Sequence, residues 1–212
     1  MASSSIEDKG KPQNWLLRVW SLECCSIEGF REVLAGEPPE HLDSQGWERT
    51  KRNCLFGAIE GKNVDLVSVL VEQPGFDVNA RFYCDCEDAC GIKCKATLAP
   101  LHVVSTRVCS ETCPTGAQSC SKRNLKILKK LLSIPGVDVN ARGFGGFAMT
   151  PVQALIVFAE VDCVKELVAV DNIDLNATDI INSLENMTKG PGAKKLTKMM
   201  KILDEGGAPQ QC

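Results

Sequence analysis

The stretch Asp77-Val78-Asn79-Ala80-Arg81 recurs as Asp138-Val139-Asn140-Ala141-Arg142 and, in a looser form, as Asp174-Leu175-Asn176-Ala177-Thr178. Before each copy, as in 64–71 and 125–132, apolar residues recur at steps of three and four, which is typical of a helix with one apolar face. The first two stretches then reach Pro74-Gly75 and Pro135-Gly136, and such pairs end a helix because proline cannot continue its hydrogen-bond ladder. The sequence therefore predicts a repeated unit of helix and turn.

A second, shorter helix is predicted before each of these stretches. Ala99-Pro100-Leu101-His102 and Thr150-Pro151-Val152-Gln153 place proline near a first helical position, and 53–56 fills the same slot in a degenerate form. The order of short helix, tight loop, longer helix and Asp-Val-Asn-Ala turn closely resembles the ankyrin repeat, over roughly residues 50 to 180. The resemblance implies an all-α stack of helix-turn-helix units with short hairpins and no extended sheet, about five units including two degenerate caps.

The spacing of the repeated turns reveals two insertions. Asn140 and Asn176 are 36 residues apart, whereas Asn79 and Asn140 are 61 apart, an excess of 25. Compared with the following unit, ten extra residues lie between Asn79 and Ala99, and fifteen lie between Ala99 and Asn124. We place these insertions at about 82–97 and 107–121.

The ends of the chain are predicted to be irregular, as the terminal units of a stack need a polar outer face. We expect a disordered tail over 1–13, a repeat domain over 14–208 with caps at about 14–36 and 180–208, and a short tail over 209–212. In the first cap, 15–20 and 27–34 read as helices; in the last, 196–203 does.

Seven of the twelve cysteines lie in the two insertions: Cys84, Cys86, Cys90, Cys94, Cys109, Cys113 and Cys120. Zinc binds four thiolate or imidazole ligands, and short cysteine spacings let one loop supply several. We therefore expect structural zinc. The four cysteines of the first insertion could complete one site alone, whereas the three of the second need a fourth ligand from the first insertion or from His102. A single site that draws on both insertions is also consistent with the sequence. Disulfides and free thiols are the alternatives. Ordinary ankyrin repeats carry no metal, so the zinc prediction does not come from the resemblance.

His102 has two interpretations. It is a candidate zinc ligand because it lies between the two insertions. The resemblance implies a different role, in which the histidine of the four-residue motif hydrogen-bonds to the backbone near the turn and stiffens it. Cys54 and Cys163 fall at helical positions and are expected to pack as small apolar groups.

Composition excludes several classes of function. A formal net charge of −3 and 5% aromatic residues argue against a nucleic-acid-binding surface. No apolar run approaches the length of a membrane span, and the polar N-terminus does not resemble a secretory signal. No Cys–His pair, nucleophile motif or phosphate-binding loop is evident. We expect a monomeric protein of the cytoplasm or nucleus that is not an enzyme.

The resemblance implies a protein-binding scaffold, because the hairpins and first helices of ankyrin repeats form a concave surface that binds partners. The hairpin residues expected on this surface are Arg81, Phe82, Tyr83, Arg142, Phe144 and Phe147. Tyrosine, arginine and phenylalanine suit such a role because they can bury large areas against a partner. The alternative is a zinc- or redox-responsive switch, in which the cysteine cluster controls partner binding.

Overall fold

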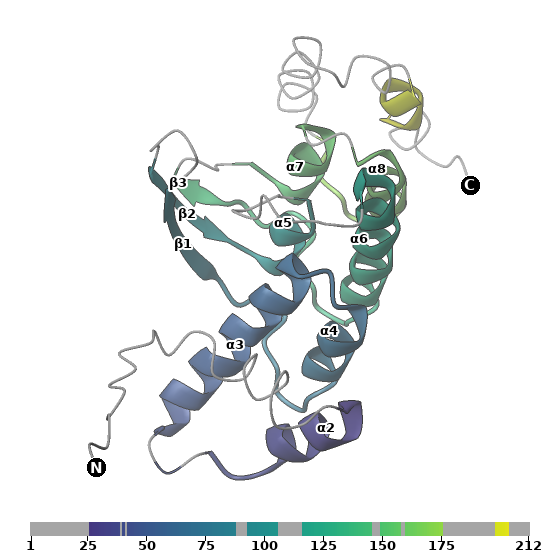
Figure 1. Cartoon of the computed structure of the whole chain (residues 1–212). Helices are drawn as coiled ribbons and strands as arrows, with labels where there is room; N and C mark the ends of the chain where they lie inside the picture. Colours follow the sequence, from purple (N-terminus) through teal and green to yellow (C-terminus); the bar gives the residue numbers. More distant parts are fainter. Residues whose placement is uncertain are drawn as a thin grey trace, which may run out of the picture.

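The computed structural model describes residues 26–38, 40, 42–87, 93–105, 116–145, 149–157, 160–175 and 198–203. Within these residues the chain is mostly helical, as the sequence predicts (Figure 1). The helices are α2 (Ile27–Ala35), α3 (Ser44–Glu60), α4 (Val64–Val71), α5 (Pro100–Ser105), α6 (Gly116–Leu132), α7 (Pro151–Val157) and α8 (Val161–Val168), with a further helix over 198–203. The predicted helix over 15–20 and the third turn from Asn176 onward lie outside the described residues.

Consecutive helices form the pairs α3/α4, α5/α6 and α7/α8, and each pair packs on the next. Contacts run from α3 to α5 to α7, and separately from α4 to α6 to α8, so the helices form two rows. The α4–α6–α8 row is extended by α2, which contacts α4. Figure 1 shows the α3–α5–α7 row between this second row and a small sheet.

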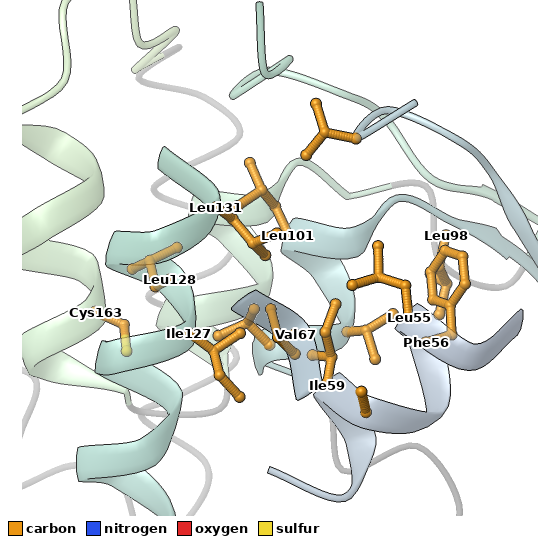
Figure 2. Close-up of a cluster of buried hydrophobic side chains, with 14 of the residues drawn as sticks. Leu55, Phe56, Ile59, Val67, Leu98, Leu101, Ile127, Leu128, Leu131 and Cys163 are labelled. Atoms are coloured by element: carbon orange, nitrogen blue, oxygen red, sulfur yellow. The ribbon is translucent and has the colours of Figure 1, made fainter. Parts of the chain in front are cut away.

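The hydrophobic core lies between the two rows. Leu55, Ile59, Leu101, Ile127 and Leu131 are among its fully buried side chains, and Figure 2 shows them converging from α3, α5 and α6. Ile127 and Leu131 belong to the apolar stripe that the sequence predicts over 125–132. The burial of apolar surface in this core is the main free energy that holds neighbouring pairs together.

The sheet is longer than the short hairpins that the sequence predicts. Strand β1 (Phe82–Glu87) pairs antiparallel with β2 (Lys93–Leu98), and β3 (Phe144–Gly145) adds a two-residue strand to β2. The ten extra residues of the first insertion thus lengthen a hairpin. The sequence signal for these strands is that two types of residue alternate with a period of two. Successive residues of a strand lie on opposite faces, so each type occupies its own face.

Helix α6 begins earlier than its apolar pattern suggests. The pattern predicts a start near Leu125, but the helix begins at Gly116 and includes part of the second insertion. Asn63 caps α4, its Oδ1 accepting from the Leu66 amide at 3.1 Å. Asn124 occupies the equivalent position 61 residues later, yet it lies inside α6, and its buried Oδ1 has no hydrogen-bond partner among the described residues.

Ion pairs link the helices of the α4–α6–α8 row along its surface. Glu72, which follows α4, binds Arg31 of α2 and Lys130 of α6, both at 2.8 Å. Further along the row Lys129 of α6 binds Glu166 of α8 at 3.0 Å. The hydrogen bonds from Lys130 and Arg31 hold the pKa of the Glu72 carboxyl below its ordinary value. Exposed pairs of this kind contribute little stability each, but they favour one register between helices.

Candidate functional site

The first two repeated turns, 77–81 and 138–142, have the same internal structure. Asp77 Oδ1 accepts from the Asn79 amide at 2.9 Å, and Asp138 Oδ1 accepts from the Asn140 amide at 3.1 Å. Such bonds to a backbone amide two residues on are what makes aspartate favourable in turns. The aspartate of each repeated motif thus fixes the local chain path.

The asparagine of each of these two turns forms hydrogen bonds to the next unit along the chain. Asn79 donates from Nδ2 to the Gly136 carbonyl at 2.8 Å and accepts at Oδ1 from the Asp138 amide at 2.7 Å. Asn140 makes the same two bonds to Asn172 and Asp174, at 2.7 and 2.8 Å. Both ends of each side-chain amide are therefore used between units. This explains physically why Asn recurs at this position.

His102 forms hydrogen bonds to the backbone through both ring nitrogens. Nδ1 accepts from the Ala99 amide at 3.2 Å, so Nε2 carries the proton and donates to the Met149 carbonyl at 2.9 Å. Burial is the largest cause that lowers the pKa of His102, and the nearby charge of Arg81 lowers it further. The neutral ring thus joins the start of α5 to the residue before Thr150.

This geometry favours the turn-stabilising role of His102 over the role of zinc ligand. A metal needs a lone pair on one ring nitrogen, but one nitrogen accepts from an amide and the other carries a proton. The side chain is also fully buried. In the following unit Gln153 replaces the histidine, its Oε1 accepting from the Thr150 amide at 2.6 Å.

The residues predicted to bind a partner fall into two groups. Arg81 donates from Nη1 to the Arg142 carbonyl, and the Phe82 ring packs on Phe56 of α3 with ring centroids 4.6 Å apart. These two side chains therefore contribute to the fold. In contrast, Tyr83 is 58% exposed and Arg142 is exposed. Phe144 forms β3, and Phe147 lies outside the described residues.

The α3–α5–α7 row offers little free surface at α5 and α7. Residues 100–104 of α5 and 151–156 of α7 are all buried. The exposed candidates Tyr83 and Arg142 instead lie in or next to the hairpins. The exposed side chains among these candidates thus lie at the hairpins and turns, which we call the turn edge, rather than on these two helices.

The β1–β2 hairpin has two chemically different faces by register. One side of β1 carries Phe82, Cys84 and Cys86. Across the ladder these residues pair with Leu98, Ala96 and Cys94. The other side carries Tyr83, Asp85 and Glu87 opposite Thr97, Lys95 and Lys93. Opposite charges on directly paired positions stabilise a hairpin. We call the side that includes Phe82 and Leu98 the cysteine face.

The structure places only some of the predicted metal ligands. Cys84 and Cys86 lie in β1, Cys94 lies in β2 and Cys120 lies in α6. Cys90, Cys109 and Cys113 lie outside the described residues. No group of three potential ligands gathers around one point among the side chains that the structure describes, a set to which the seven insertion cysteines do not belong.

Two cysteines outside the insertions are packed in the core. Cys54 is 1% exposed and Cys163 is fully buried, and burial raises the pKa of each thiol to about 12. A thiolate is the reactive form of cysteine, so these two groups are inert at neutral pH. Their packing role is the one that the sequence predicts.

Comparison of the sequence with models of known protein families gives no match, and comparison with curated proteins gives none either. Of the helices in the described part of the chain, none has the length and apolar character needed to cross a membrane.

Proposed function

We propose that this protein is a stack of ankyrin-type repeats that binds another protein through the turn edge. The observation that carries the proposal is the equivalence of successive units. The Asn79 turn joins the Asn140 turn by the same pair of hydrogen bonds through which the Asn140 turn joins residues 172–174. Similar units that contact mainly their neighbours are the defining feature of repeat proteins.

The backbone conformation at the turns supports the same assignment. Gly75 and Gly136 adopt positive φ angles of 72° and 80°, and Asn172 adopts 66° at the corresponding place in the next unit. Glycine and asparagine are the residues that tolerate this left-handed conformation. Units that differ in sequence length therefore share one turn geometry.

The proposed binding surface is centred on Tyr83 and Arg142. Both belong to types that dominate the energetics of protein interfaces, and neither the core nor the asparagine bridges depend on the Tyr83 ring. Because Arg81 anchors to the Arg142 carbonyl, the backbone that presents Arg142 is held firmly. A rigid backbone with exposed side chains reduces the entropy lost on binding.

Affinity capture with matched variants tests this function. The full chain is used as bait beside Tyr83→Ala/Arg142→Ala and beside Lys126→Ala, which changes an exposed residue of α6 away from the turns. We expect at least one protein to be retained by the wild type and by Lys126→Ala and to be lost from the double variant. Direct binding of that purified protein, weakened more than about tenfold by the double variant, completes the test. Equal retention by all three baits would contradict the proposed surface.

A further inference from the structure

The cysteine face of the hairpin brings three thiol-bearing residues to neighbouring register positions. Cys86 is paired directly with Cys94 across the ladder, and Cys84 lies two residues before Cys86 on the same strand. Residues two apart on a strand share a face, and directly opposed residues share it too. Cys84, Cys86 and Cys94 therefore occupy one side of the ribbon.

Their spacing suits one metal ion. Directly paired Cα atoms in an antiparallel ladder are about 4.5 to 5.5 Å apart, and Cα atoms two residues apart on a strand are separated by roughly 6.5 to 7 Å. Zinc bound to thiolates has Zn–S distances of about 2.3 Å, so the sulfur atoms of a tetrahedral site lie roughly 3.8 Å apart. Side chains from Cα atoms at these separations can converge to such a distance.

This part of the hairpin needs a source of order other than the core. Phe82 and Leu98 at its base pack against the helices, and the described part of β3, Phe144–Gly145, pairs with Thr97 and Ala96. Within the residues that the structure describes, the ladder from Asp85 to Glu87 therefore has two strands. An isolated two-stranded hairpin is marginally stable in water, and the binding of a metal contributes directly to ordering a segment.

The alternation of residue types agrees with a metal on one face. The opposite face pairs Asp85 with Lys95 and Glu87 with Lys93, so its charges are balanced and suited to solvent. The cysteine face carries no charged residue within the two strands, and Phe82 and Leu98 close its base. Thiolates are typical ligands for zinc rather than for calcium or magnesium.

We propose that Cys84, Cys86 and Cys94 supply three thiolate ligands to one zinc ion on the cysteine face. Each thiol loses its proton when it binds the metal, and the fourth position of the tetrahedron is open to another insertion cysteine or to water. The site orders the hairpin whether or not a partner is bound, so it stands apart from the proposed function. His102 is not part of it.

Metal content and cobalt spectroscopy of the full chain test the site. Protein purified under reducing conditions should contain about one zinc ion per chain, and replacement by Co²⁺ should give the intense absorption of a tetrahedral thiolate complex. The sulfur-to-cobalt charge-transfer band of the wild type should correspond to at least three thiolates. Zinc-free reduced protein that does not take up Co²⁺, or a band corresponding to fewer than three thiolates, would overturn the proposal.

Variants identify the ligands. Cys84→Ser, Cys86→Ser and Cys94→Ser should each weaken zinc binding by more than about tenfold, whereas Asp85→Asn, on the opposite face of the same strand, should bind as the wild type does. Retained affinity in any of the three serine variants would remove that residue from the site and overturn the three-ligand assignment. A Cys86–Cys94 disulfide in protein prepared without oxygen, found by mass spectrometry, would favour a redox role instead.

Discussion

The start of α5 shows how a single ring can join two units. His102 accepts from the Ala99 amide and donates to the Met149 carbonyl, and Gln153 performs the first of these tasks one unit later. A glutamine is neutral at every pH, whereas a histidine is not. The two residues are therefore interchangeable in geometry but differ in their response to acid.

The wild type should lose stability below pH 6.5 as His102 resists protonation, and we expect His102→Gln to remove this loss. The folded state holds the pKa of His102 below its ordinary value of 6.5, so His102 favours the folded state above that pH. As the pH falls, the unfolded chain takes up a proton that the folded ring resists, and stability is lost. Urea unfolding at pH 7.5 and at pH 5 measures the effect. The control is Gln45→Ala, an exposed residue of α3, which should remain as acid-sensitive as the wild type; a His102→Gln chain with the same sensitivity would refute the assignment.

The glycine of the second turn can be tested against the asparagine of the third. No atom lies within 4 Å of a Cβ built on Gly136, but its φ angle is +80°, so the cost of a side chain comes from the backbone. We expect Gly136→Ala to reduce the free energy of unfolding by about 1 to 2 kcal/mol. Gly136→Asn should cost less, because Asn172 adopts a φ angle of 66° at the equivalent place. Equal losses in denaturant melts would show that the left-handed conformation is not the cause.

The buried thiols predict a loss of stability in alkali. Burial raises the pKa of Cys163 from 9.0 to about 12, so above pH 9 the unfolded thiol ionises while the folded one stays neutral. The stability that it contributes is present below pH 9 and falls by up to about 1.4 kcal/mol per pH unit above it. Cys163→Ala should show a shallower fall between pH 9 and 10 than the wild type in urea melts. Gln45→Ala, at an exposed position of α3, serves as the control, and an unchanged slope in Cys163→Ala would count against burial of the thiol.

Helix α6 is attached to the core through fully buried side chains, of which Leu131 is one. Leu131 is completely buried in the cluster that Figure 2 shows between α5 and α6. We expect Leu131→Ala to destabilise the protein by roughly 2 to 5 kcal/mol, since the cavity cannot close fully. Lys126→Ala, on the exposed side of the same helix, should change stability by less than about 0.5 kcal/mol. If Leu131→Ala has nearly the same free energy of unfolding in urea as the wild type, the apolar stripe of α6 does not face the core.

The elements could be predicted from sequence where the pattern is periodic. The stripes of α4 and α6, the Pro-Gly ends and the Asp-Val-Asn-Ala turns carry strong signals because each reflects a single local requirement. The early start of α6 has no strong sequence signal, since Gly116 to Ser121 are mostly weak helix formers. In addition, Asn124 occupies the position at which Asn63 caps α4, so the pattern predicts that the helix begins after Asn124. The strands were missed because cysteine and charged residues dominate the alternation. Burial of α5 and α7 depends on tertiary packing, so the reduced binding surface could not be foreseen.

For the whole molecule, the first insertion should be dispensable for folding. Deletion of residues 84–93 shortens the segment from Asn79 to Ala99 to the length found between Asn140 and Thr150, and it leaves Phe82, Leu98 and the pairing of β3 intact. We expect the helical circular dichroism spectrum to persist and the thermal midpoint to change by less than about 5 °C. A loss of cooperative unfolding would show that the hairpin is part of the folding unit, in conflict with a stack of neighbour-coupled repeats.

Successive turns and successive helices are joined by two different kinds of bond. Uncharged amide bridges from Asn79 and Asn140 run along the turns, whereas charged pairs such as Arg31–Glu72 and Lys129–Glu166 run along the α4–α6–α8 row. Dissolved salt screens exposed charges over a Debye length of about 8 Å at physiological ionic strength and leaves the amide bridges almost unaffected. Added salt therefore weakens the ionic links between the helices of this row, while the links between the turns keep their strength.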